Sequence, residues 1–281
     1  MPERDAVTIA VVYPDLLGTY GDGGNAAILA RRLEWRGVPA RILQVTLGTP
    51  LPSSCDVYLL GGGEDAPQAL AAEELRRAGS LRAAVDRGAA VLAVCAGLQV
   101  VGARFSAGDR VHDGVGLADI DSLRRLPRRA VGELVVEPDA ELGLPILSGY
   151  ENHASVSVLG PDVRPFGRVR SGVGNGDPAA DRSGTVDGVL AGHLLGTYLH
   201  GPALARNPEL ADLLVRWVLG DVPVPQGERE AASLEAADRA AADLRTERLD
   251  AVGRPARRRA RLRRSAHVSP LAAPSGSASG R

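Results

Sequence analysis

Residues 91–97, Val-Leu-Ala-Val-Cys-Ala-Gly, form a short apolar run that ends at a cysteine, and a helical pattern begins directly afterwards. Such a strand–turn–helix unit presents a nucleophile, and its tight turn accepts only small neighbours, here Ala96 and Gly97. A sulfur at a helix N-terminus is also placed where the backbone dipole favours the thiolate. The segment therefore predicts a nucleophilic Cys95, with a buried cysteine that closes a core strand as the alternative.

Apolar runs alternate with helical patterns on both sides of this segment. Strands are predicted at 7–13, 39–45, 56–60 and 89–94, and helices at 26–35 and within 66–88. This alternation predicts an α/β fold, with a doubly wound, mostly parallel sheet flanked by helices on both faces. The second half is more strand-like, with strands predicted at 129–137, 153–159 and 194–199 and a helix at 207–219.

The composition changes near residue 225. We expect residues 1–225 to form the globular domain, whereas residues 226–281 hold 12 Arg against 7 Asp and Glu. Within this second part, residues 228–250 predict a polar, alanine-rich helix, and the basic end predicts disorder. A basic tail can bind nucleic acid or anionic lipid, but a solvated tail is the simpler interpretation. No nucleic-acid partner is expected.

The composition also excludes several kinds of chemistry. The chain lacks lysine, so all 33 basic residues are arginine. A P-loop and a Schiff base both require lysine, which leaves any ATP and Mg²⁺ to another subunit. We expect no metal and no cofactor in this chain. With two cysteines at unrelated positions and no apolar run of membrane-spanning length, a cytoplasmic protein is the default expectation.

A cysteine nucleophile needs a base that removes its proton and later delivers it to the leaving group. His200 is the best candidate, because it ends the predicted strand at 194–199. The carboxyl ends of parallel strands share one edge of a sheet, so His200 and Cys95 would meet there. A lone histidine at a strand end is more often structural, and that interpretation stays open. The other histidines are His112, His153, His193 and His267.

A second signal lies at the end of the predicted strand 56–60, where Gly61-Gly-Gly63 follows. Glycines at such a place let backbone amides approach a ligand closely. These amides, with those of the cysteine turn, predict an oxyanion hole at the sheet edge.

Six motifs together resemble the class I (triad) glutamine amidotransferases. They are Tyr20-Gly-Asp-Gly-Gly-Asn25, Gly61-Gly-Gly-Glu-Asp-Ala-Pro-Gln68, Cys95-Ala-Gly-Leu-Gln99, Arg129-Ala-Val-Gly-Glu133, Gly149-Tyr-Glu-Asn-His153 and Gly196-Thr-Tyr-Leu-His-Gly-Pro202. Within this class the chain resembles the cobyric-acid-synthase-like branch, and most specifically the glutaminase subunits of lipid II isoglutaminyl synthase (GatD). The resemblance implies a flavodoxin-like α/β fold and hydrolysis of glutamine to glutamate and ammonia.

The resemblance also implies catalytic roles. Cys95 would attack the side-chain amide of glutamine, and His200 would act as general base and acid. Many members carry a glutamate two residues after the histidine, but Pro202 stands there. Either the pair works as a dyad or an acid comes from elsewhere, and the resemblance suggests the partner subunit. Glu151 and His153 look like a local acid–base pair, but we interpret them as shaping the site.

Substrate-binding roles follow from the same resemblance. Arg129 would hold the glutamine by a bidentate contact with its α-carboxylate, and Arg128 is the adjacent alternative. The backbone amides of Gly62 and Ala96 would form the oxyanion hole.

The implied partner is a MurT-like Mur-ligase subunit in a heterodimer. That subunit would bind ATP and Mg²⁺, take up the ammonia and amidate the stem-peptide D-glutamate of lipid II. The expected location is the cytoplasm, at the inner membrane face where lipid II is made. One alternative is a cobyrinate-type amidotransferase subunit, although that branch normally fuses a synthetase domain for which 281 residues leave no room. The other alternative is a catalytically silent binding or regulatory module of the same fold.

Overall fold

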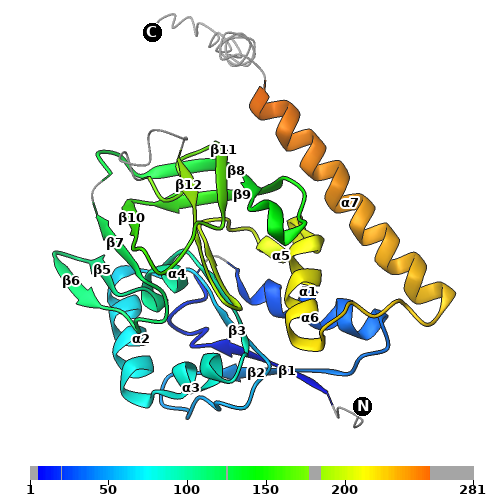
Figure 1. Ribbon diagram of the computed structural model, residues 1–281, viewed down its shortest axis with the longest axis horizontal. Coiled ribbons are helices and arrows are strands. Elements are labelled where there is room, and N and C mark those ends of the chain that lie inside the picture. The colour runs from blue at the N-terminus through cyan, green and yellow to red at the C-terminus, as the bar shows by residue number, and fades with distance from the viewer. Residues whose placement is uncertain (1–5, 20, 125, 177–184, 254–281) are drawn as a thin grey trace, which may run out of the picture.

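The chain folds around a six-stranded sheet in the order β13-β14-β4-β3-β1-β2 (Figure 1). The computed structural model describes residues 6–19, 21–124, 126–176 and 185–253. The strands are β1 (Val7–Val12), β2 (Ala40–Val45), β3 (Val57–Leu60), β4 (Ala90–Val94), β13 (Val189–Ala191) and β14 (Leu194–Thr197). Neighbouring strands pair in parallel except at the edge, where β13 runs antiparallel to β14. The predicted doubly wound, mostly parallel sheet is confirmed.

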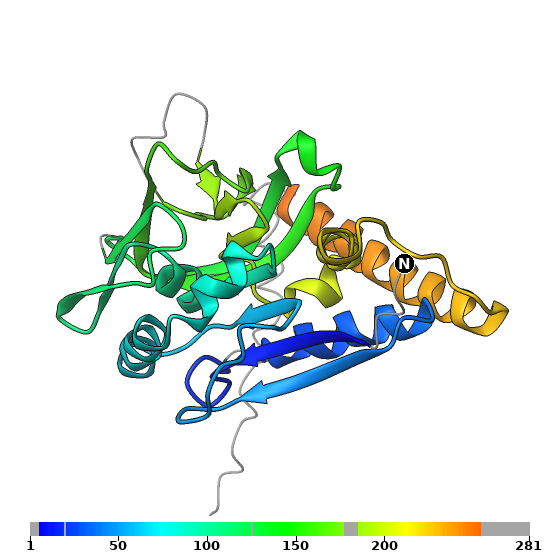
Figure 2. The same cartoon turned by 60° about the horizontal axis from the view of Figure 1, so that its bottom comes forward.

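Two groups of helices cover this sheet. On one side α1 (Gly23–Trp35) contacts α5 (Ala203–Arg206) and α6 (Pro208–Leu219), and on the other α2 (Asp65–Ala78) contacts α3 (Ser80–Asp86) and α4 (Ala96–Val101). Figure 2 shows α1 lying along β1 and β2. Because both faces are covered, the central strands β3, β4 and β14 are buried at every residue, as their continuous apolar sequences predict.

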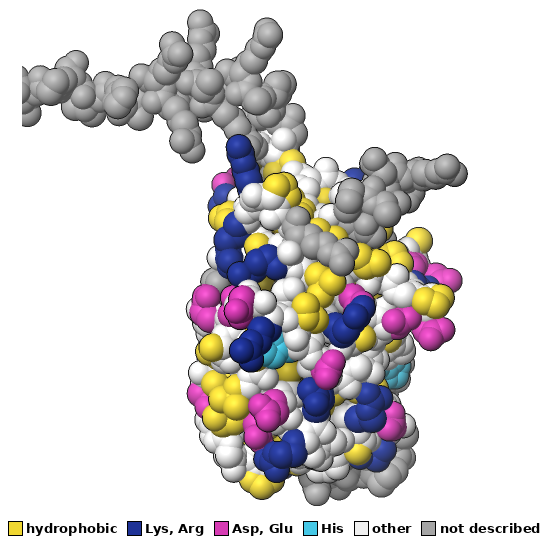
Figure 3. Space-filling view, turned by 90° about the vertical axis from the view of Figure 1, so that its left-hand side faces the viewer, with side chains coloured by type: hydrophobic (Ala, Val, Ile, Leu, Met, Phe, Trp, Pro, Cys, Tyr) yellow, Lys and Arg dark blue, Asp and Glu magenta, His cyan; other side chains and the backbone are white. Residues whose placement is uncertain are grey.

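Two smaller sheets lie over the carboxyl edge of the main sheet. One has the order β10-β7-β5-β6 and the other β12-β11-β8-β9. Their elements are β5 (Arg104–Ala107), β6 (Arg110–Asp113), β7 (Ile120–Arg124), β8 (Ala130–Pro138), η1 (Ala140–Leu142), β9 (Leu147–His153), β10 (Ser155–Leu159), β11 (Gly167–Ser171) and β12 (Val186–Asp187). The predicted strands at 129–137 and 153–159 correspond to β8 and β10. Figure 3 shows basic and acidic side chains interspersed on the face that carries β6 and α2.

The C-terminal helix α7 (Glu228–Gly253) contacts α1, α5, β8 and β9. Two ion pairs hold it: Asp238 with Arg32 at 2.5 Å and Arg245 with Glu209 at 2.6 Å. The predicted polar helix is therefore present, and it rests on the globular part through charged contacts. The boundary at residue 225 stays a prediction, and residues 254–281 lie outside the described chain. Among the described helices, none is long and apolar enough to cross a membrane.

Candidate active site

Cys95 lies in the turn between β4 and α4. Its backbone has φ 53° and ψ −103°, a strained conformation for a residue other than glycine. Its N–H donates to the Thr197 carbonyl oxygen at 2.9 Å, which ties the turn to the end of β14. Strained backbone of this kind gathers at functional sites, and here it presents a sulfur at the carboxyl edge of the sheet.

Burial determines the pKa of the Cys95 thiol. The side chain is 5% exposed, and this burial raises its pKa to about 12, with the negative charge of Asp22 acting in the same direction. The Ala96 N–H at the start of α4 lowers the pKa, but by less. The helix terminus, which the sequence suggested would favour the thiolate, is thus outweighed by desolvation. The resting site holds a thiol and needs a base close by.

His200 follows β14 and is fully buried. Its backbone N–H donates to the Tyr150 carbonyl oxygen of β9 at 2.9 Å, and its imidazole ring stacks on the Tyr150 ring with the centroids 5.0 Å apart. Burial lowers its pKa to about 4, and the positive charges of His153 and Arg129 act in the same direction. At neutral pH the imidazole is therefore uncharged, which is the form that a general base requires.

The topology brings Cys95 and His200 to the same edge. Strands β4 and β14 are parallel neighbours, and Val94 pairs with Thr197, so both chains leave the sheet at the same level. The pKa of Tyr150 is raised by burial and then by the charges of Asp22 and Cys95. Since the Tyr150 ring stacks on His200, these groups form one cluster.

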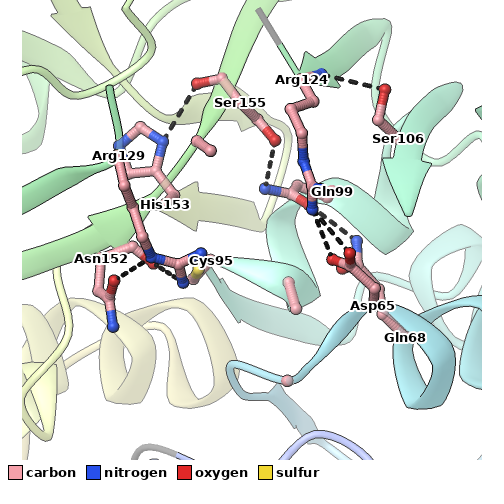
Figure 4. Close-up of a pocket in the computed structure, with 13 residues that line it drawn as sticks. Asp65, Gln68, Cys95, Gln99, Ser106, Arg124, Arg129, Asn152, His153 and Ser155 are labelled. Atoms are coloured by element: carbon pink, nitrogen blue, oxygen red, sulfur yellow. Dashed lines mark hydrogen bonds and ion pairs between the residues drawn. The ribbon is translucent and has the colours of Figure 1, made fainter. Parts of the chain in front are cut away.

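A polar pocket opens beside Cys95 (Figure 4). Its polar wall comes from α2, α4 and the small sheets, and includes Asp65, Gln68, Gln99, Ser106, Arg124, Arg129, Asn152, His153 and Ser155. Gln68 donates to Gln99 at 2.8 Å, and Arg124 forms an ion pair with Asp65 at 2.7 Å. Sequence reasoning missed the Arg124–Asp65 pair because Arg124 belongs to none of the six motifs.

Arg129 contributes a second guanidinium to this pocket. It donates to the Asn152 side-chain oxygen at 2.5 Å and to the Asn152 carbonyl oxygen at 3.1 Å. Its charge lowers the pKa of Cys95, so it lies near the sulfur, as Figure 4 shows. Arg128 is not among the residues that line the pocket. The geometry thus favours Arg129 over its neighbour as the substrate arginine.

The two predicted oxyanion-hole residues differ in placement. Ala96 lines the pocket beside Cys95. The Gly62 N–H instead donates to the Asp22 carboxylate at 2.7 Å, and the neighbouring Gly63 lines the pocket in its place. The structure departs from the prediction here, because a Gly62 amide that is bound to Asp22 reaches an oxyanion only after that hydrogen bond is released.

The sequence matches one family model over most of its length. Residues 8–208 match the CobB/CobQ-like glutamine amidotransferase domain. The chain belongs to this family. The family prediction and the predicted fold class are therefore confirmed.

Proteins with two kinds of name are among the curated relatives of this amidotransferase. The lipid II isoglutaminyl synthase subunit GatD of Staphylococcus aureus (strain N315) is 32% identical over 213 residues, which cover 74% of this chain and 83% of that protein. GatD of Streptococcus pneumoniae (strain R6) is 31% identical over 76% of this chain and 80% of that protein. A cobyric acid synthase of Sphingopyxis alaskensis is 31% identical over 62% of this chain but only 34% of its own length.

The second histidine of the amidotransferase pocket, His153, belongs to a different set of contacts. Its Nε2 lies 3.4 Å from the Glu151 carboxylate, and its ring stacks on Tyr198 with centroids 3.8 Å apart. Glu151 accepts the N–H groups of Val173 and Gly174 at 2.8 and 2.9 Å. These bonds fasten β9 to the loop after β11, in keeping with a role in shaping the site.

Within the described ranges no group of three or more His, Cys, Asp or Glu side chains is arranged to hold a metal ion.

Proposed function

We propose that this amidotransferase is the glutaminase subunit of a lipid II isoglutaminyl synthase. It hydrolyses L-glutamine to glutamate and ammonia, and the ammonia amidates the stem-peptide D-glutamate of lipid II. The observation that carries the proposal is a strained Cys95 and a neutral, buried His200 at the same edge of the sheet, in a chain that is 32% and 31% identical to two GatD subunits over about three quarters of its length.

The chemistry proceeds through a thioester. His200 removes the proton from the Cys95 thiol as the sulfur attacks the carboxamide carbon of glutamine. The resulting oxyanion accepts hydrogen bonds from the Ala96 N–H and, once released from Asp22, the Gly62 N–H. His200 then protonates the departing nitrogen, which leaves as ammonia. His200 then deprotonates a water molecule, which attacks the thioester. Glutamate is released and the free thiol of Cys95 is regenerated.

Substrate binding rests on Arg129 at the pocket wall. A guanidinium forms two parallel hydrogen bonds with a carboxylate, which fixes the amino-acid end of glutamine and aims its side chain at Cys95. The Arg124–Asp65 pair stands on the same wall and adds one charge of each sign to the pocket.

The arginine assignment predicts a binding defect. Arg129→Lys keeps the charge but loses the bidentate fork, so the KM for glutamine should rise about 10- to 100-fold, or about 1.4 to 2.8 kcal/mol, while kcat changes little. Steady-state glutamate release measures both constants. The matched control, Arg128→Lys, should stay within about twofold of the unmodified chain. A KM defect confined to the Arg128 variant would move the clamp to that residue.

The proposed partner is a MurT-like ligase subunit that binds ATP and Mg²⁺ and accepts the ammonia. Two observations support a divided enzyme: the chain has no lysine for a P-loop, and the GatD relatives are named as subunits. We place the reaction in the cytoplasm, at the membrane face where lipid II is made.

A cobyrinate-type amidotransferase subunit is the second candidate, because cobyric acid synthases also match this chain. The two candidates differ in the acceptor that stimulates glutamine hydrolysis. With the ligase partner and MgATP present, we expect lipid II to raise the rate of glutamate release and a corrinoid carboxylate acceptor to leave it unchanged. The opposite pattern would favour the second candidate. Glutamine hydrolysis under neither condition would leave the silent module as the better description.

A further inference from the structure

Asp22 is a buried carboxylate that its own helix does not use. It stands immediately before α1, at the N-cap position where an aspartate normally accepts an N–H of its own helix. In the described structure its side chain makes no such bond. Its Oδ2 instead accepts the Gly62 N–H at 2.7 Å and lies 3.8 Å from Nδ1 of His200. Its Oδ1 is buried and has no hydrogen-bond partner within the described residues.

Two glycines allow this approach. A Cβ on Gly61 would come within 2.7 Å of the Asp22 Cβ and 2.3 Å of the Leu17 carbonyl oxygen. A Cβ on Gly24 would come within 2.5 Å of Cγ of Pro202, in the loop that follows His200. The start of α1 and the histidine loop therefore pack closely only because these positions lack side chains.

We propose that Asp22 is the positioning acid of His200, supplied by this chain rather than by a partner subunit. The inference rests on the proposed glutaminase function. An Nδ1–H that faces Asp22 leaves the Nε2 lone pair free to take the Cys95 proton, and the carboxylate then stabilises the imidazolium. At 3.8 Å the contact is too long for a hydrogen bond. Such contacts are often long in unliganded sites and tighten when substrate binds.

The charges around Asp22 fit this role. It faces the Gly62 N–H, His200, Cys95 and Tyr150. Burial raises the pKa of Asp22 to about 6, against the opposing effect of the Gly62 N–H, so the carboxylate is mostly ionised at neutral pH. Its charge opposes a bare thiolate on Cys95. Because it lies 3.8 Å from Nδ1 of His200, it would also stabilise a positive charge on that ring once the thiol proton has been transferred. Asp22 therefore does not stabilise a Cys95 thiolate by itself. It stabilises the product of proton transfer, in which a Cys95 thiolate faces a His200 imidazolium.

Asp22→Asn removes the negative charge of this side chain but keeps an acceptor for the hydrogen bond from Gly62. The asparagine Oδ1 still accepts the Gly62 N–H, but its NH₂ group turns to His200 and favours the tautomer with the proton on Nε2, which cannot accept the thiol proton. We expect kcat for glutamate release, measured with the ligase partner, to fall about 10²- to 10⁴-fold. The KM for glutamine should stay within about threefold, because Asp22 does not line the glutamine pocket.

A second readout needs neither partner nor substrate. Alkylation of Cys95 by iodoacetamide, followed from pH 5 to 9 and mapped by mass spectrometry to separate it from Cys55, reports the reactive thiolate. If Asp22 acts through the imidazolium of His200, Asp22→Asn should shift the alkylation profile to higher pH. Loss of its negative charge beside Cys95 alone would shift the profile to lower pH, and a purely structural role for the Gly62 hydrogen bond would leave it in place; either result contradicts the positioning role. Asp56→Asn is the matched control, since Asp56 likewise accepts a backbone N–H, that of Thr8 at 2.8 Å, at the opposite end of β3. It should change neither readout.

The thermal stability of Asp22→Asn shows whether the variant has lost only the charge or has also lost its fold. A carboxyl whose pKa is raised on folding binds protons more tightly in the native state, so stability falls from about pH 4 to about pH 6 and the whole penalty is present at pH 7. Asparagine carries no such penalty, and the Tm of Asp22→Asn at pH 7 should equal or exceed that of the unmodified chain. If this variant unfolds, Asp22→Ser, which keeps a small acceptor, replaces it with the same expectations.

The outcomes are distinct. If the unmodified chain and its partner release no glutamate, the proposed function fails, whatever Asp22 does. If the unmodified complex is active and Asp22→Asn keeps kcat within about threefold with an unchanged alkylation profile, the positioning role is wrong. The acid then comes from the partner or is not needed.

Discussion

Cys95→Ser is expected to abolish amidation that depends on glutamine, while amidation from added ammonium survives. The hydroxyl of serine is a far weaker nucleophile than a thiolate, and the elbow and His200 are built to activate sulfur. In the proposed division of labour the ligase subunit consumes only free ammonia, so the second half-reaction should be unaffected. Glutamate release and lipid II amidation, each measured with glutamine and then with ammonium chloride, separate the two half-reactions.

Cys55→Ser is the matched control for this prediction. Cys55 is also 5% exposed, but it lies just before β3, at the end of the sheet opposite Cys95. Its replacement should leave glutaminase activity within about threefold, since no proposed step uses it. Glutaminase activity that persists in Cys95→Ser would remove Cys95 from the role of nucleophile.

His200→Ala is expected to lower kcat for glutamate release by about 10³-fold or more, because a nucleophile and its base act as a unit. In the proposed mechanism the buried, neutral imidazole removes the thiol proton, and the raised pKa of Cys95 leaves almost no thiolate without it. Ammonium-dependent amidation should again survive. Thermal unfolding of the variant checks that the stack with Tyr150 was not needed for folding.

His153→Gln provides the comparison for His200. His153 lines the pocket, and its ring nitrogens face Glu151 and the Ser155 carbonyl oxygen. We expect a smaller loss of activity, of about tenfold, through a disturbed pocket wall. A severe loss in His153→Gln with a mild one in His200→Ala would show that His153 is the base.

The sequence was sufficient where the signal is local. The valine-rich run of β4, with small residues after Cys95, carries the elbow in consecutive positions. His200 required one further step, since parallel pairing of β4 and β14 brings it to the same sheet edge as Cys95 although the two are far apart in the chain, and its role as the base stays a prediction.

The sequence was insufficient where contacts join distant loops. In the sequence Asp22 is one residue of the glycine-rich motif before the predicted helix 26–35, and only the packing of the start of α1 against Gly61 turns it toward His200. The same contact occupies the Gly62 amide, which a glycine-rich loop alone cannot reveal. Strand β9 was missed because Gly149 and polar residues interrupt its apolar pattern, although it carries the Tyr150 that stacks on His200.

The most direct test follows the amide nitrogen of glutamine into lipid II. The chain, a Mur-ligase-like subunit, MgATP, lipid II and glutamine labelled with ¹⁵N in its side-chain amide are incubated together, and mass spectrometry measures the label. We expect one labelled nitrogen in the D-isoglutamine of lipid II for each glutamate released, and none with Cys95→Ser. Glutamate release without label in lipid II, or label that appears in a corrinoid acceptor instead, would contradict the proposed function.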